Sequence, residues 1–166
     1  MEIFDYFSNE KRIWIDKIRA CDWSAAILLA DLLDNNSFHS VLGNGSLFIM
    51  ADGEKIVSFC TLSQWDCIKD DEMFPWIGFV FTAPEYRGNR CSGEVIEAAC
   101  KRALKQGFDR VYLATDHVGL YEKYGFEYVE SRVDIYNEES RVYCLKLKNK
   151  MGVLKYGNNY EPYWLR

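Results

Sequence analysis

A turn rich in glycine and arginine, "PEYRGNRCSGEV" at residues 84–95, is the stretch of the sequence best suited to bind an anion. It follows the apolar run "WIGFVFTA" and precedes a segment with helical periodicity, so the free N–H groups of a helix N-terminus would point at one spot. Gly88 and Asn89 tolerate positive φ, and Arg87 and Arg90 add positive charge. The pattern predicts a phosphate-binding turn; the alternative is a plain strand–helix connection with solvated arginines.

Two common nucleotide-binding motifs do not fit this turn. A dinucleotide fingerprint needs G-x-G-x-x-G, and "GNRCSG" lacks the middle glycine. A Walker A loop needs G-x-x-x-x-G-K-[ST], and Gly88 and Gly93 have that glycine spacing. However, Glu94 then places a negative charge where the lysine belongs, and Val95 offers no magnesium ligand. Both motifs are excluded.

The region "FVFTAPEYRGNRCSGEVIEAA" resembles the signature of the GNAT superfamily of acetyltransferases, which runs Arg/Gln-x-x-Gly-x-Gly/Ala between a strand and a helix. Arg87 matches the first position, Ser92 stands near the Gly/Ala end, and Arg90 replaces an expected glycine. "GLYEKYGFE", residues 119–127, is similar to the Leu-Tyr-x-x-x-Gly-Phe element that follows the next strand in this superfamily. The resemblance covers residues 9–148 in element order and leaves out the tail beyond.

This resemblance implies a bound acetyl-CoA. The pantetheine arm would pair with the backbone of the strand before the turn, and the pyrophosphate would lie over the amides that follow. Arg90 and Lys123 are candidates for the ribose phosphate. We expect Arg90 to adopt a helical conformation at no backbone cost, with its N–H on the pyrophosphate and its side chain outward. The residues assigned to the cofactor are Val80, Phe81, Thr82, Arg87, Gly88, Asn89, Arg90, Cys91, Ser92 and Gly93.

The resemblance also implies the chemistry, in which an amine attacks the thioester carbonyl and a thiolate leaves. Tyr121 matches the tyrosine that often acts as the catalytic acid, and a phenol of ordinary pKa, about 10, can protonate that sulfur. The alternative is that Tyr121 is a helix-face aromatic like Tyr124.

The strand "WIGFVFT" carries no acidic residue, although many family members place their base there. The nearest candidates are Asp116 and His117, of which His117 is preferred because imidazole changes charge near neutral pH. A surface histidine is the alternative. Four loop carboxylates could line the acceptor side and attract a cation, or could be solvated charges: Asp66, Asp70, Asp71 and Glu72.

The elements that position these groups follow from hydrophobic periodicity. We expect one α/β domain over residues 1–148, with a mostly antiparallel GNAT-like sheet, one right-handed parallel crossover and flanking helices. Asp22 should cap the second helix, Gly107 should end the third, and Gly78 indicates a bulge or a close backbone approach. The expected helices are Asn9–Ala20, 21–35, Arg90–Gln106 and a short 118–125; the expected strands lie within 46–64 (a hairpin turning at Asp52–Glu54), 76–82, 110–115, 126–135 and 140–148.

Composition narrows the function further. The net charge of −5 argues against a nucleic-acid partner, the N-terminus resembles no signal peptide, and the apolar runs are too short for a membrane span, so we expect a cytoplasmic protein. Six cysteines without C-x-x-C spacing and two histidines argue against zinc and disulfides. The aromatic segment 149–166 is expected to dock on the body or on the partner subunit of a homodimer.

Taken together, these features predict an acetyl-CoA-dependent N-acetyltransferase that acts on a primary amine of a small molecule or protein in a ternary complex. A CoA-binding domain without catalysis, and an enzyme that uses a hydroxyl acceptor or a longer acyl chain, are the alternatives.

Overall fold

A seven-stranded mixed sheet in the order β1-β2-β3-β4-β5-β7-β6 forms the centre of the protein. The structure is a computed structural model that describes residues 1–68 and 70–148, so the predicted docking of segment 149–166 lies outside the described residues. The strands are β1 Glu2–Asp5, β2 Gly45–Asp52, β3 Lys55–Ser63, β4 Trp76–Thr82, β5 Arg110–Thr115, β6 Glu127–Val133 and β7 Glu139–Lys146. The helices are α1 Arg12–Arg19, α2 Ser24–Asp34, α3 Phe38–Leu42 and α4 Cys91–Lys105, with 3-10 turns η1 Tyr6–Ser8, η2 Pro84–Tyr86 and η3 Tyr121–Tyr124.

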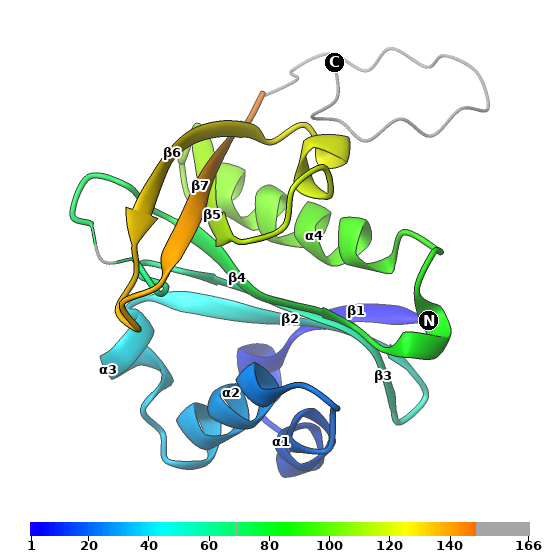
Figure 1. The fold of residues 1–166 in the computed structure, drawn as a ribbon. Coiled ribbons are helices and arrows are strands. Elements are labelled where there is room, and N and C mark those ends of the chain that lie inside the picture. The colour runs from blue at the N-terminus through cyan, green and yellow to red at the C-terminus, as the bar shows by residue number, and fades with distance from the viewer. Residues whose placement is uncertain (69, 149–166) are drawn as a thin grey trace.

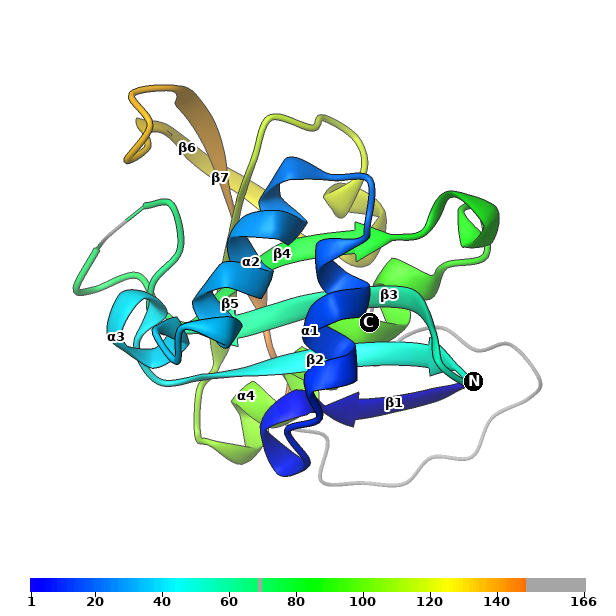
Figure 2. The ribbon, with the colours of Figure 1, turned by 90° about the horizontal axis from the view of Figure 1, so that it is seen from below.

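Helices cover both faces of this sheet. Figure 1 shows α4 on one face and α1 and α2 on the other, and Figure 2 shows α1 and α2 lying across the strands. Side chains of β2 alternate between the two faces, as the pleat requires. Phe48 and Met50 pack with α4, whereas Leu47 and Ile49 pack with the N-terminal helices. The sheet therefore separates two hydrophobic cores.

Most of the predicted elements are confirmed, including the hairpin between β2 and β3 and the closing antiparallel pair β6 and β7. The β4–α4–β5 unit is the one parallel connection in the sheet. Gly107 has φ +91° and follows the end of α4, and the N–H of Phe108 donates to the carbonyl of Ala103, as in a Schellman stop.

Four details of the prediction are wrong. The strand β1 and the short helix α3 were not expected, because neither is long enough to show a clear period. The first helix begins at Arg12 rather than at Asn9, after the turn η1. Asp22 does not cap α2; its N-cap is Trp23, without a side-chain hydrogen bond.

The central strand β4 carries the expected irregularity. Phe59 pairs with Phe81 and Thr61 pairs with Gly78, so two residues of β4 face Cys60 alone, which is a β-bulge. The residue with the unusual backbone is Phe79 at φ +48°, not Gly78.

The parallel pairing of β4 with β5 consists of a single pair, Trp76 with Tyr112. Beyond this pair the facing edges of the two strands are unpaired among the described residues. Within those residues, no helix has the length and apolar character needed to cross a bilayer.

Candidate active site

The predicted anion turn forms a bend followed directly by the N-terminus of α4. Gly88 has φ +81°, and a Cβ there would meet open space. The side-chain amide of Asn89 donates to the backbone carbonyls of Tyr86 and Arg87, and these bonds stabilise the bend. The first turn of α4 leaves the N–H groups of Cys91, Ser92 and Gly93 without a backbone carbonyl partner among the described residues. These outward N–H groups and the helix dipole fit an anionic group.

Arg90 does not have the conformation that the sequence suggested. It is the N-cap of α4 and lies in the left-handed region at φ 60° and ψ 18°. An L-residue pays about 1–2 kcal/mol in that region, so the expectation of no backbone cost is wrong. The glycine of the family signature is thus favoured at this position by φ, and the side chain of Arg90 is exposed.

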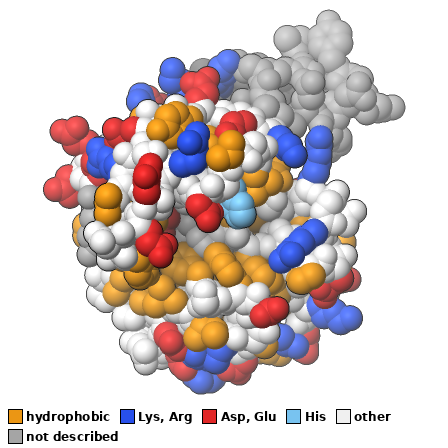
Figure 3. All heavy atoms as spheres, in the orientation of Figure 1, with side chains coloured by type: hydrophobic (Ala, Val, Ile, Leu, Met, Phe, Trp, Pro, Cys, Tyr) orange, Lys and Arg blue, Asp and Glu red, His pale blue; other side chains and the backbone are white. Residues whose placement is uncertain are grey.

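A cavity of about 300 Å³ lies where β4 and β5 separate. Figure 3 shows a hollow on this face of the molecule, with hydrophobic side chains along its lower edge and carboxylates together with a histidine above it. Four carboxylates and no lysine or arginine belong to its described lining. The lining residues are Trp23, Asp66, Ile77, Gly78, Phe79, Val80, Leu113, Ala114, Thr115, Asp116, His117, Tyr121, Glu138, Glu139 and Ser140.

Tyr121 is held in this cavity by packing. It lies in η3, is 6% exposed, and its ring contacts those of Tyr124 and Phe126. Burial raises the pKa of Tyr121, and nearby Cys60 and Tyr124 raise it further. The phenol of Tyr121 is therefore a weaker acid than a phenol of ordinary pKa. It stays protonated at neutral pH and can donate a hydrogen bond there. Its neighbour Tyr124 instead bonds to Ser92 of the anion turn, with 2.8 Å between their hydroxyl oxygens.

Asp66 reaches the cavity from the loop between β3 and β4. A Cβ built on Gly78 would lie 2.8 Å from Asp66 Oδ1, so the carboxylate occupies the space above that glycine. Burial raises the pKa of Asp66 to about 6, Asp134 adds to the rise, and a hydrogen bond with the backbone of Cys67 opposes it.

Asp116 and His117 also line the cavity, but both are exposed. The backbone N–H of His117 donates to Thr115 Oγ1, which fixes the loop rather than the imidazole. Of the four loop carboxylates, the structure brings only Asp66 into the lining. Asp70 instead pairs with Arg132, at 2.5 Å, and accepts from the N–H groups of Glu72 and Met73.

Three residues of β4 and Lys123 remain among the predicted site residues. Val80 faces the cavity, whereas Phe81 is packed against Phe59 and the carbonyl of Thr82 accepts from Arg87 Nε at 3.3 Å. Lys123 is exposed on η3. In the sequence, Asp66 is only one of four loop carboxylates that could line the acceptor side. Gly78, within a strand otherwise rich in large side chains, was the signal that another group approaches β4 there.

A larger cavity of about 760 Å³ lies at the opposite end of β3 and β4, beside the C-terminal part of α4 at Gln106. Tyr121 and the anion turn are not part of its lining. We therefore place the candidate site at the smaller cavity.

Solved structures with this fold are numerous, and three illustrate the likeness. The aminoglycoside 6'-N-acetyltransferase from Enterococcus faecium aligns over 92% of this chain and 100% of its own, with a TM-score of 0.66 and 11% identity. An acetyltransferase from Streptococcus agalactiae aligns over 89% and 98%, with a TM-score of 0.61 and 24% identity. A GNAT family acetyltransferase from Elizabethkingia anophelis with acetyl-CoA bound aligns over 88% and 97%, with a TM-score of 0.62 and 16% identity.

A comparison with curated protein sequences finds no match. The model of the acetyltransferase (GNAT) family, however, matches residues 11–126, well over half of the 166 residues. The match includes the anion turn, the crossover β4–α4–β5 and Tyr121. This chain belongs to the GNAT family of acetyltransferases.

Proposed function

We propose that this protein transfers the acetyl group of acetyl-CoA to a primary amine by direct attack in a ternary complex. The observation that carries the proposal is the cavity at the separation of β4 and β5, because it joins the unpaired edge of β4 to the buried phenol of Tyr121. A proton donor, a proton acceptor and an open strand edge then meet in one place.

The residues present fit acetyl-CoA at this place. The free N–H groups at the start of α4 would hold the pyrophosphate, helped by Arg87 and Arg90, and the open edge of β4 around Val80 would pair with the pantetheine amides. When bound, acetyl-CoA supplies an acyl thioester. Tyr121 would then donate its proton to the departing sulfur. The solved relative from Elizabethkingia anophelis contains acetyl-CoA, which supports this assignment.

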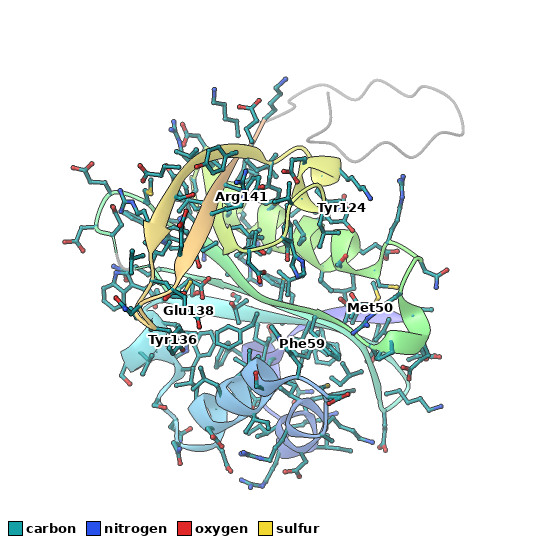
Figure 4. All side chains as sticks on the ribbon, viewed as in Figure 1. Met50, Phe59, Tyr124, Tyr136, Glu138 and Arg141 are labelled. Atoms are coloured by element: carbon teal, nitrogen blue, oxygen red, sulfur yellow. The ribbon has the colours of Figure 1, made fainter. Side chains whose placement is uncertain are left out.

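The lining of the cavity favours a positively charged acceptor. Its described lining has four carboxylates, from Asp66, Asp116, Glu138 and Glu139, and no basic side chain apart from His117. Figure 4 places Glu138 at the β6–β7 turn. Negative charge in a confined cleft raises the local concentration of cations, so amines that carry a further ammonium group should be preferred over neutral or acidic amines.

The test measures thiol release from acetyl-CoA by the purified chain against a panel of amines, with product detection by mass spectrometry. Transfer to diamines or amino sugars, with little transfer to amino acids, is the expected result. Binding of CoA by isothermal titration without any transfer would instead support the domain without catalysis, and absence of CoA binding would overturn the proposal.

The six free cysteines also support a cytoplasmic location, where thiols stay reduced.

A further inference from the structure

The position of Asp66 explains why the strand β4 contains a glycine at position 78. Gly78 lies within this strand, and its φ is outside the left-handed region that favours glycine. The glycine is therefore present for space rather than for backbone conformation. That space is filled by the Asp66 carboxylate, whose Oδ1 lies 2.8 Å and whose Oδ2 and Cγ lie 3.0 Å from the position of a Cβ on Gly78.

The two faces of β4 separate Asp66 from Tyr121. Ile77 and Tyr121 belong to the core under α4, and Gly78 points to the opposite face because neighbouring side chains of a strand alternate. Thr61, the cross-strand partner of Gly78, has a buried hydroxyl without a partner among the described residues on this same face. Asp66 and Tyr121 thus approach one cavity from opposite sides of β4.

We propose that Asp66 is the catalytic base of the acetyl transfer, delivered by the β3–β4 loop into the space that Gly78 leaves open. This assignment rests on the proposed function. A base and an acid on opposite sides of β4 suit a transfer in which the amine enters from one side and the sulfur leaves toward the other.

The proton balance of the step is complete. The acceptor enters as an ammonium ion and gives one proton to the Asp66 carboxylate, which later releases it to solvent. The freed nitrogen lone pair forms the bond to the thioester carbonyl carbon, and the carbon–sulfur bond breaks. The sulfur takes a proton from Tyr121, and the second proton lost by the nitrogen returns to Tyr121 through water.

The electrostatic surroundings support this role. The pKa of Asp66, raised to about 6 by burial, is closer to the pKa of an alkylammonium, about 10.4, than the pKa of an ordinary aspartate is. The carboxyl is nevertheless mostly ionised at neutral pH. The charged or titratable groups around it are Cys67 on its own loop, Asp134 and Tyr136 on the β6–β7 turn, and Tyr121 on η3. Asp116, His117, Glu138 and Glu139 complete the described lining of the cavity.

The first test is the pH dependence of kcat/KM with the best amine from the panel. The wild-type rate should rise with pH through a midpoint near 6. Asp66→Asn should lower kcat/KM by about 10²–10⁴-fold and remove this rise. His117→Asn should keep the rise of kcat/KM with pH. Asp71→Asn removes an exposed carboxylate of the same loop that is not in the cavity lining, and should keep both the rate and the rise.

The second test moves the carboxylate to the strand. Asp66→Ala with Gly78→Asp places a carboxylate near the same point from β4, and should recover part of the rate that Asp66→Ala alone loses. Gly78→Ala should also lower the rate, because its methyl group displaces the Asp66 carboxylate. CoA affinity by isothermal titration should stay close to that of the wild type in all these variants.

A readout without any substrate checks the environment of the carboxylate. The NMR titration of Asp66 in the free protein should show its midpoint near 6, and Gly78→Ala should shift it. Transfer that keeps its pH rise in Asp66→Asn, but loses it in His117→Asn, would overturn the assignment of Asp66 and leave the proposed function standing. A wild-type protein that binds no CoA and transfers to no amine would overturn both.

Discussion

Arg90 has a backbone conformation that its residue type disfavours, and the cost can be measured as a change in the free energy of unfolding. Its φ of 60° costs an L-residue about 1–2 kcal/mol, while glycine loses about 0.5–1 kcal/mol in chain entropy. Arg90→Gly should therefore increase the free energy of unfolding by roughly 0.5–1 kcal/mol, as measured by urea denaturation. Arg87→Gly, at φ −62°, relieves no such strain and should be neutral or destabilising.

The same variant also tests the role of the Arg90 side chain. If only its backbone N–H binds the pyrophosphate, Arg90→Gly should leave the affinity for CoA within a few-fold of wild type. A sharp loss of affinity would show instead that the guanidinium is a phosphate ligand.

Tyr121 is the residue on which the proposed acid chemistry depends. Tyr121→Phe keeps the ring contacts with Tyr124 and Phe126 but removes the proton, so kcat should fall by about 10²-fold or more while CoA affinity is retained. Tyr124→Phe, in the same turn, removes a hydroxyl that bonds to Ser92 and should keep most of the wild-type kcat. An unchanged kcat in Tyr121→Phe would remove it from the mechanism.

Asp66 should make stability depend on pH. Its folded pKa of about 6 exceeds the ordinary value of about 3.9, so folding favours the protonated form, and stability is lost as pH rises through this window. Asp66→Asn should therefore stabilise the protein by about 1–3 kcal/mol at pH 7.5 and much less at pH 4. Equal effects at both pH values in urea denaturation would argue that the Asp66 carboxyl is not perturbed.

At the scale of elements, the first turn of α4 and the turn η3 are coupled. A Cβ on Gly93 would lie 2.9 Å from Cε1 of Tyr124, so Gly93→Ala should push the ring away and break its hydrogen bond to Ser92. Loss of one such bond is worth about 1 kcal/mol, which predicts a roughly fivefold weaker affinity for CoA.

The control for this coupling is the same substitution without the ring. In a Tyr124→Ala background, Gly93→Ala should cause no further loss of CoA affinity. Equal losses in the two backgrounds, measured by isothermal titration, would show that the ring does not transmit the effect.

At the scale of the whole molecule, Asp5 connects the N-terminal strand to α4. Its side chain is 8% exposed, pairs with Arg102 at 2.9 Å, and accepts from the N–H groups of Phe7 and Leu47. Asp5→Ala leaves these donors and the guanidinium without their acceptor and should cost about 2–4 kcal/mol in the free energy of unfolding. Lys101→Ala breaks an exposed pair with Glu97 on α4 and should cost less than about 1 kcal/mol.

Long periodic segments could be predicted from the sequence, because their patterns report burial directly. The strand β4 was predicted with its observed bounds, and α4 to within one residue at each end. The short elements β1 and α3 could not be predicted, since four or five residues carry too little pattern and β1 depends on pairing with β2. The φ of Arg90 was also beyond reach, because the turn imposes a conformation against the preference of the residue.

The sequence by itself determined the family, the crossover, the bend before α4 and the position of Tyr121 after β5, since each depends on residues that are close along the chain. Only the tertiary structure decided which carboxylate of the β3–β4 loop enters the cavity. Asp66 and Gly78 are separated by an irregular loop, and no local pattern shows that one fills the space left by the other. The physical reason is that such contacts depend on how a loop folds back over the sheet, which packing of the whole chain determines.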